Sequence, residues 1–353
     1  MTTMPLALFS LALFAAACSS RDAAESSDAA DAILLDTRTR ESKAQYRENL
    51  SFVTGYTPQC AVLDATLPRV LVAGYGRFQG IEENLTGLMV ASLVGGVYPR
   101  PVINVGKPIP PAAVAMVRTA IVNLSGQRVN LCGLVLPVYW DLAPLIVEKE
   151  SIRFTPQVVL LNGVAGSGDP VRFELGSANQ ALPLLDGSDL LAPRKRVFSD
   201  VLQPIVRTLP TSATEPSRFP YVQARQAVED ELAKISNEDS GAFDRLVAGV
   251  GYAPYPSEYL TYLCNNVVYV TNYLASHPGV SVRLMESSSS TSGVSVLARG
   301  GDAQLVRTFV HWPHLEGVSD VAKATRLMRA LLAAAVKHRG SAVSGESVRA
   351  DLP

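Results

Sequence analysis

Three short apolar runs along the chain predict strands that are buried on both faces. They cover residues 69–73, 135–138 and 158–161, and a break in the apolar pattern follows each of them. A strand covered by helices on both sides has no solvent-facing positions, so its sequence is continuously apolar rather than alternating. The runs therefore predict parallel strands in the interior of a sheet.

Segments with the apolar spacing of helices lie between and after these runs. They are residues 85–93, 112–124, 221–235, 267–275 and 321–337. Strands that alternate with helices predict an α/β fold, here a three-layer α/β/α sandwich with a mostly parallel central sheet. Ligands of such folds bind at the carboxyl ends of the strands, so the residues after each strand are the place to look for chemistry.

Three further segments are expected outside this regular core. Residues 280–297 form two alternating runs around a serine-rich turn, which predicts a β-hairpin excursion. Residues 182–220 are rich in Pro and Ser and predict a long surface excursion. We expect one catalytic domain over residues 63–340, followed by a flexible tail over 341–353.

The N-terminus has the pattern of an export signal. Its apolar run, residues 5–17, is too short to cross a bilayer, and small residues precede Cys18. This arrangement looks like a signal segment and bacterial lipoprotein box over residues 1–18, whose cysteine would be acylated after cleavage. A secreted form without a lipid, or a non-functional leader, is the alternative. Residues 19–62 would form a tether and N-terminal extension, and we expect an exported, periplasmic, membrane-anchored protein.

Composition excludes some classes of protein. The net charge is −1 and there is no basic run, so nucleic acid is not an expected partner. Four cysteines, without metal-ligand spacing, are too few for a disulfide scaffold and suggest no metal site. In an oxidising compartment the economical hypothesis is a lipid on Cys18, a Cys60–Cys132 disulfide and a free Cys264. Nothing in the sequence indicates an oligomeric state.

Three residues have positions that suit catalysis. Cys264 stands where a helical pattern begins, and a helix N-terminus favours the nucleophilic thiolate. Glu174 lies among apolar neighbours, where a carboxylate needs a partner, and His311 ends an apolar strand. Each also has an ordinary interpretation: a buried core cysteine, a solvated strand glutamate and a structural histidine.

The glycine-rich turn after the first strand does not predict a nucleotide site. Its sequence is Gly-Tyr-Gly-Arg-Phe-Gln-Gly over residues 74–80. It has neither the Gly-x-Gly-x-x-Gly spacing nor the Gly-Lys-Ser/Thr ending of phosphate-binding loops. No cofactor is therefore expected.

Four segments together resemble the pyroglutamyl (pyrrolidone-carboxyl) peptidases, a family of cysteine exopeptidases. Residues 70–80 are similar to its first strand and Gly-Phe-Gly-x-Phe-x-Gly loop, with Asn84 as the asparagine that follows. Residues 163–179 resemble its glycine-rich turn and Glu-x-x-x-x-Asn segment. Leu263-Cys264-Asn265 resembles the nucleophile motif, and residues 309–313 resemble its Phe-Ile-His-Val-Pro strand end.

The resemblance implies a Cys-His-Glu triad. Cys264 would be the nucleophile, His311 the base that activates it, and Glu174 the group that orients the imidazole. This order of roles recurs on unrelated folds. The implied substrate is a peptide with an N-terminal pyroglutamate.

The resemblance also implies a binding loop for the pyroglutamyl ring. Tyr75 and Phe78 would sandwich the lactam, with Gly76 between them in the sequence. The ordinary interpretation of the two aromatic residues is packing of the loop.

The chain departs from the family at several positions. Tyr259 and Leu260 stand where the family has Ala-Gly, and Leu184 stands where it has an arginine. Arg172 or Arg194 are the candidates to replace that arginine. The chain is also longer, with insertions around residues 97–125, 182–220 and 280–301.

Three functions remain open on these grounds. The first is an exported cysteine peptidase of pyroglutamyl type. The second is a relative that uses the same triad on another amide or lactam. The third is a catalytically silent envelope lipoprotein that binds a peptide or a partner through the same cleft.

Overall fold

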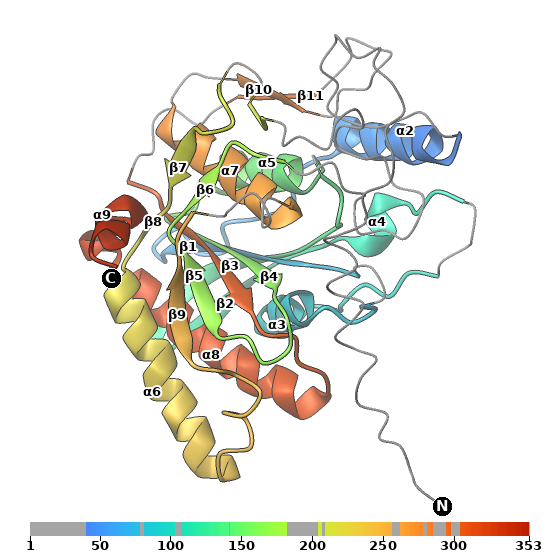
Figure 1. Ribbon diagram of the computed structural model, residues 1–353. Coiled ribbons are helices and arrows are strands. Elements are labelled where there is room, and N and C mark those ends of the chain that lie inside the picture. The colour runs from blue at the N-terminus through green and yellow to red at the C-terminus, as the bar shows by residue number, and fades with distance from the viewer. Residues whose placement is uncertain are drawn as a thin grey trace, which may run out of the picture.

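A computed structural model of the chain describes residues 40–77, 81–102, 107–140, 142–181, 204–206, 209–255, 262–277, 281–284, 294–297 and 304–352. Within this part, nine strands form one sheet, drawn in Figure 1. They are β1 (Arg69–Tyr75), β2 (Met116–Leu124), β3 (Gln127–Leu136), β4 (Val158–Val164), β5 (Val171–Glu174), β8 (Arg218–Phe219), β9 (Val250–Ala253), β12 (Val306–Trp312) and β13 (Val343–Ser344).

Parallel strands form the centre of this sheet. The order is β13-β8-β12-β4-β1-β3-β2, and β5 and β9 branch from β12. The pairs β12–β4, β4–β1 and β1–β3 are all parallel, whereas β2 pairs antiparallel with β3, and β5 and β8 pair antiparallel with β12. The carboxyl ends of β1, β3, β4 and β12 therefore meet at one edge of the sheet.

Helices cover both faces of the sheet (Figure 1). On one face lie α2, α5 and α7, and on the other lie α3, α6 and α8. The helices are α2 (Arg40–Gly55), α3 (Leu85–Val94), α4 (Pro111–Val114), α5 (Leu142–Phe154), α6 (Tyr221–Asp239), α7 (Leu263–Ser276), α8 (Val318–Lys337) and α9 (Gly345–Ala350).

Alternate residues of each central strand pack into two different cores. In β1, Leu71 and Ala73 join the core beneath α5 and α7, while Val70 and Val72 join the core beneath α3 and α8. Successive side chains of a strand point to opposite faces, so both sets must be apolar when both faces are covered. The predicted three-layer α/β/α sandwich with a mostly parallel sheet is confirmed.

One predicted helix is wrong. Residues 112–124 contain only the last three residues of the four-residue α4 before they continue as β2, which pairs antiparallel with β3 along its whole length. Ser125 and Gly126 have positive φ values of 49° and 92° and make the tight turn between the two strands. The β-branched residues of β2 suit this edge position, and pairing with β3 decides the conformation.

The other predicted helices are found, and their bounds move outward. Residues 85–93, 221–235, 267–275 and 321–337 lie in α3, α6, α7 and α8. The β-hairpin excursion is confirmed as well, because β10 (Ser281–Leu284) pairs antiparallel with β11 (Val294–Leu297). Of the excursion over 182–220, the described part includes β7 (Thr214–Pro216), which pairs with β6 (Gly176–Ala178).

The C-terminal segment is not the flexible tail that the sequence led us to expect. β13 pairs with β8, and the backbone N–H of Gly345 donates to the carbonyl of Ser217 at 2.8 Å. A Cβ at position 345 would collide with the backbone of Leu175, so glycine lets the chain pack closely there. A short segment therefore gains order by adding to a sheet edge, which apolar periodicity does not indicate.

The N-terminal extension is attached to the domain by a disulfide and a buried carboxylate. Cys60 and Cys132 are bonded, with their Cα atoms 5.7 Å apart, and this confirms the pairing hypothesis. Glu150 accepts hydrogen bonds from the backbone N–H groups of Gln59 and Cys60 and from the hydroxyl of Tyr56. Burial, and then this hydrogen bond, raise the pKa of Tyr56 well above its ordinary value.

The leader and its anchor fall outside the described residues. Cys18, the signal segment 1–18 and the tether that follows it lie before residue 40, so they stay predictions. In the described part of the chain, every helix is too short or too polar to cross a membrane.

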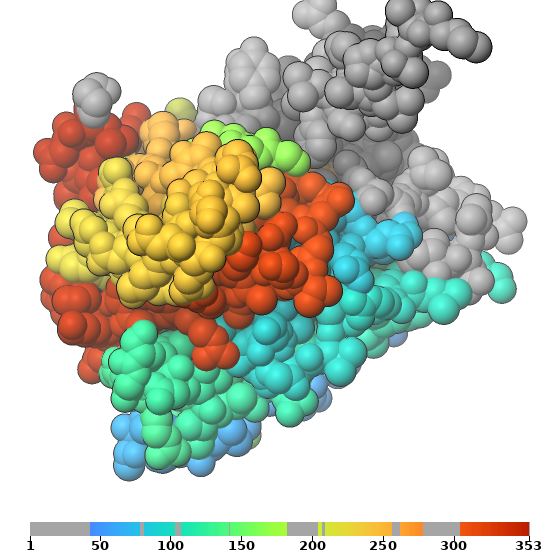
Figure 2. Space-filling view, turned by 90° about the horizontal axis from the view of Figure 1, so that it is seen from below, coloured from blue at the N-terminus to red at the C-terminus, as the bar shows by residue number. Residues whose placement is uncertain are grey.

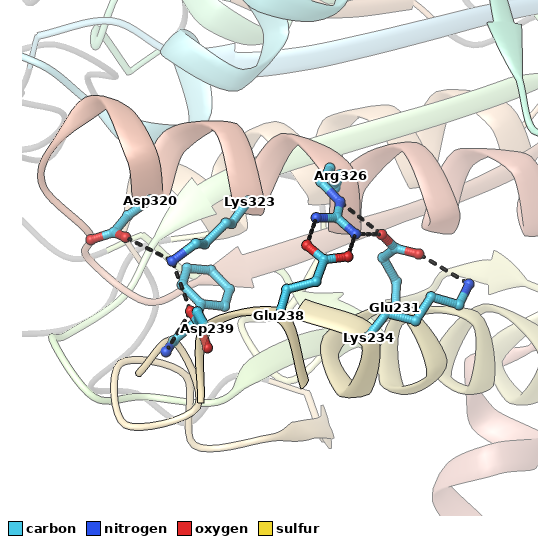
Figure 3. Close-up of polar contacts among 8 residues, drawn as sticks. Glu231, Lys234, Glu238, Asp239, Asp320, Lys323 and Arg326 are labelled. Carbon is cyan, nitrogen blue, oxygen red and sulfur yellow. Dashed lines mark hydrogen bonds and ion pairs between the residues drawn. The ribbon is translucent and has the colours of Figure 1, made fainter. Parts of the chain in front are cut away.

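Ion pairs join the two long helices of the outer layer. α6 and α8 lie side by side on the face seen in Figure 2. Lys323 of α8 pairs with Asp239 at 2.7 Å, and Arg326 pairs with both Glu231 and Glu238 of α6 (Figure 3). These side chains all remain partly exposed to solvent, so the contacts orient the helices more than they stabilise them.

Candidate active site

The sheet register brings His311 and Glu174 together. β12 and β5 are antiparallel, with His311 opposite Arg172 and Phe309 opposite Glu174. Residues 172, 174, 309 and 311 therefore share one face, and Glu174 is the diagonal neighbour of His311. Nδ1 of His311 lies 2.9 Å from Oε1 of Glu174. Two residues from separate predicted strands thus form one ion pair.

Glu174 has a buried carboxylate, and hydrogen bonds to its backbone carbonyl hold the residue in place. Its side chain is only 8% exposed, and its carbonyl accepts hydrogen bonds from the hydroxyls of Tyr221 and Thr308. No hydrogen-bond donor of the described residues reaches its second carboxylate oxygen, Oε2. A buried carboxylate needs a compensating charge, so the ion pair with His311 is its main partner.

Cys264 is the second residue of α7, and its thiol is not in a disulfide. The two asparagines after it hold this end of the helix in place. The side chain of Asn265 exchanges hydrogen bonds with the backbone of Ala178 and also donates to the carbonyl of Gln180. Asn266 donates to the carbonyl of Trp140 at 2.7 Å. The start of α7 is therefore fixed to the end of β6 and to the turn at Trp140, and the thiol with it.

Gly163 provides the space for the thiol. It lies on β4 directly beside His311, in the parallel pairing of β4 with β12. A Cβ at position 163 would lie 2.9 Å from Sγ of Cys264 and 2.6 Å from the ring of Phe309. The absent side chain thus lets Cys264 approach the sheet next to His311. The sequence pattern placed Gly163 in a glycine-rich turn, but this role depends on a contact with residue 264.

His311 connects the other two members of the site. It hydrogen-bonds to Cys264 and to Glu174, and its side chain is 23% exposed. Burial by itself lowers the pKa of His311, but the charge of Glu174 and the hydrogen bonds to Cys264 and Glu174 outweigh it and raise the pKa to about 10. The imidazole is therefore protonated at neutral pH, between a thiol and a carboxylate.

The residues expected in the binding loop are only partly described. Tyr75 is buried, with its ring in the core beneath α5 and α7 and its hydroxyl 3.4 Å from the carbonyl of Leu263. The N–H of Gly76 donates to the carbonyl of Leu136. Phe78 lies outside the described residues, so the sandwich around a lactam stays a prediction.

The departures from the family motif are also partly described. Arg172, a candidate to replace the missing arginine, is paired with Asp169 at 2.7 Å and is half-exposed at the edge of the site. Leu184, Arg194, Tyr259 and Leu260 lie outside the described residues.

Asparagines in the motifs or next to them have structural roles that the sequence did not reveal. Asn84 caps the start of α3 by accepting from the N–H of Thr86. Asn179 donates to three carbonyls in the segment 206–210. Asn162 accepts from the indole of Trp312 and donates to the carbonyl of Ala73, which ties β4 to β12 and β1. These bonds rigidify the edge of the sheet on which the site lies.

The described residues of the site do not form a ligand set for a metal ion. Over the described ranges, no three His, Cys, Asp or Glu side chains are grouped as metal ligands.

Comparison with known proteins finds similar solved structures but no similar sequence. No protein-family model matches the chain, and no curated protein matches it. Pyroglutamyl peptidase I of Bacillus amyloliquefaciens is similar over 77% of this chain and 98% of its own, with 13% identity and a TM-score of 0.48.

Two other similar structures are pyrrolidone carboxyl peptidases. The one from Thermococcus litoralis has 14% identity, covers 78% of this chain and 96% of its own, and has a TM-score of 0.45. The one from Thermus thermophilus has 20% identity, covers 75% of this chain and 98% of its own, and has a TM-score of 0.42. Their names are those of the family that the sequence motifs resemble. Because every TM-score is below 0.5, we draw no functional conclusion from these likenesses.

Proposed function

We propose that the chain is a cysteine exopeptidase that hydrolyses N-terminal pyroglutamyl-peptide bonds. The observation that carries the proposal is the position of His311, which hydrogen-bonds to Cys264 on one side and to Glu174 on the other. A nucleophile, a base and a group that orients the base are the parts that covalent amide hydrolysis needs. The motifs around Tyr75, Glu174, Cys264 and His311 support pyroglutamate as the acyl group.

The proposed reaction begins with a charged pair. The Cys264 thiolate attacks the carbonyl carbon of the scissile bond, and the carbonyl π electrons move to oxygen. When this oxyanion collapses, the C–N bond breaks and the leaving nitrogen takes the proton held by His311. A high His311 pKa suits this step, because the imidazole carries its proton at neutral pH.

The second half of the reaction releases the acyl group. A water molecule attacks the thioester carbonyl while His311 accepts its proton. The C–S bond then breaks, which frees pyroglutamate and restores Cys264 as the thiolate and His311 as the imidazolium. Glu174 keeps its charge throughout and holds the Nδ1 side of the ring.

The start of α7 supplies the group that stabilises the oxyanion. The first N–H groups of a helix have no intrahelical acceptor and point out of its N-terminus. Cys264 is the second residue of α7, so its own N–H points toward the space that the carbonyl oxygen occupies during attack. Asn265 and Asn266 hold this turn in a fixed place before substrate arrives.

We also propose that the protein acts outside the cytoplasm, anchored through Cys18. The Cys60–Cys132 disulfide supports export, since such bonds persist in oxidising compartments. Mass spectrometry of the mature N-terminal peptide tests the anchor: acyl chains on Cys18 support it, and an unmodified cysteine contradicts it.

The function is tested with protein that lacks residues 1–18, incubated with a fluorogenic pyroglutamyl amide. The matched substrate is the prolyl amide, which has the same ring without the lactam carbonyl, and the matched protein is Cys264→Ser. We expect release from the pyroglutamyl amide alone and none from the variant. Equal release by the Cys264→Ser protein contradicts a cysteine peptidase.

A negative result with this substrate still separates the other functions. The same sample is treated with iodoacetamide at neutral pH. Rapid alkylation of Cys264 without turnover indicates a hydrolase for another amide or lactam. A thiol that does not react indicates a binding protein with the same fold.

A further inference from the structure

Tyr75 makes a contact with the nucleophile's own peptide unit. It is the last residue of β1, is 4% exposed, and its hydroxyl donates to the carbonyl of Leu263 at 3.4 Å. Leu263 and Cys264 are the first two residues of α7. A buried phenol on the sheet therefore reaches the turn of helix that carries the catalytic thiol.

The carbonyl of Leu263 and the N–H of Cys264 belong to the same peptide bond. This bond is planar and trans, so the two groups point in opposite directions and move together. A hydrogen bond to the carbonyl also polarises the N–H at the other end of the unit. We infer that Tyr75 is a positioning residue that fixes the Leu263–Cys264 peptide and so aims the Cys264 N–H at the oxyanion.

The start of α7 has no side-chain capping bond from its N-cap residue, Tyr262, to the N–H groups of the first turn, as far as the described residues show. The side chains of Asn265 and Asn266 bond to β6 and to the turn at Trp140. The carbonyl of Leu263 accepts the first i→i−4 bond inside the helix, and the Tyr75 hydroxyl adds a second donor to it from the sheet. The bond is long, and such bonds often tighten only when substrate is bound.

A neutral phenol suits this position. Burial raises the pKa of Tyr75 well above its ordinary value of 10, and the charges of Cys264, Glu174 and Tyr262 raise it further. His311, the remaining titratable group of the site, is hydrogen-bonded to Cys264 and Glu174. Tyr75 thus stays a protonated donor wherever the enzyme works, and it adds no negative charge near a developing oxyanion.

The inference rests on the proposed function only through the use of Cys264 as an acyl acceptor. It is tested with two reagents that attack the same thiol in different ways. Acylation by p-nitrophenyl acetate passes through a tetrahedral oxyanion. Alkylation by iodoacetamide is a displacement at a saturated carbon and forms no oxyanion. Only the first reaction uses the Cys264 N–H.

We expect Tyr75→Phe to lower the rate of acylation by about tenfold, below the 10²- to 10³-fold effect of losing an oxyanion donor outright. Alkylation should stay within about twofold of wild type. Tyr98→Phe is the matched control, because its buried hydroxyl likewise donates to a backbone carbonyl, that of Glu82 at 3.1 Å. It should change neither rate, and Cys264→Ser defines the background.

The other outcomes overturn either the inference or the proposed substrate. Equal loss of both rates means that the hydroxyl acts on the thiol or the fold, and no loss of either means that the peptide needs no support. A wild-type thiol that p-nitrophenyl acetate does not acylate removes the triad as well. Acylation that depends on Tyr75, in a protein that leaves the pyroglutamyl amide intact, refutes only the proposed substrate.

Discussion

Charged side chains on the two faces of one sheet are organised in opposite ways. Between α6 and α8, Lys323 and Arg326 pair with carboxylates that water also reaches. Beneath α7, Glu174 is almost fully buried and pairs with His311, which also contacts a thiol. Solvent weakens the first set, whereas burial makes each charge of the second set depend on its neighbours. The first arrangement joins helices, and the second changes protonation states.

The substitution with the largest expected effect is Gly163→Ala, beside the buried pair. The added methyl would contact Sγ of Cys264 and the ring of Phe309, so the thiol must move away from His311. A displacement of about 1 Å in a catalytic group costs about 100-fold in kcat/KM. Overpacking should also lower the free energy of unfolding by about 1–3 kcal/mol.

The control for this substitution is Gly251→Ala. Gly251 lies on β9, where a Cβ would meet nothing within 4 Å. Both variants are assayed for activity and for thermal unfolding. Full activity in Gly163→Ala would show that the thiol does not use the space above this glycine.

Glu174→Gln tests the electrostatic part of the site. We expect about a tenfold loss of kcat, because the amide still orients the ring but carries no charge. In wild type, His311 must keep its proton to act as the acid, so kcat should fall as pH rises through about 10. Since the charge of Glu174 raises this pKa, the alkaline fall should move to lower pH in the variant.

The matched control is Glu215→Gln, another buried carboxylate near a histidine, His277, at 3.7 Å. It is not part of the triad and should leave the alkaline fall near pH 10. Equal pH profiles for wild type and Glu174→Gln would mean that Glu174 does not control His311.

The smallest effect on stability and activity is expected for the ion pairs between α6 and α8. Arg326→Ala removes the pairs with Glu231 and Glu238 but no buried charge. Differential scanning calorimetry should show a decrease in Tm of no more than about 2 °C, reduced further by salt, with unchanged kcat. A large decrease in Tm, or a loss of activity, would remove the distinction between the two faces.

Sequence patterns predict the fold well where burial is local. Continuous apolar runs identify β1 and β4, because helices cover both faces of these strands. β2 was misassigned because strand pairing with β3, and not its own periodicity, decides its conformation. β13 and α9 were missed because they gain order only by packing against β8 and Leu175.

The site could be predicted only as separate residues. Order and local context single out Glu174, Cys264 and His311, but their meeting depends on the antiparallel register of β5 and β12. The roles of Gly163 and of the Tyr75 hydroxyl are contacts with α7, more than 90 residues further along the chain. No pattern within either segment could indicate such contacts.

The most direct test of the account is a titration of His311 by NMR. The chain has only 4 histidines, so the imidazole signals can be assigned with His311→Ala as reference. We predict that His311 stays doubly protonated at neutral pH and titrates near pH 10, and that Cys264→Ser and Glu174→Gln each lower this midpoint. A midpoint near 6.5 that neither substitution moves would contradict the charged triad.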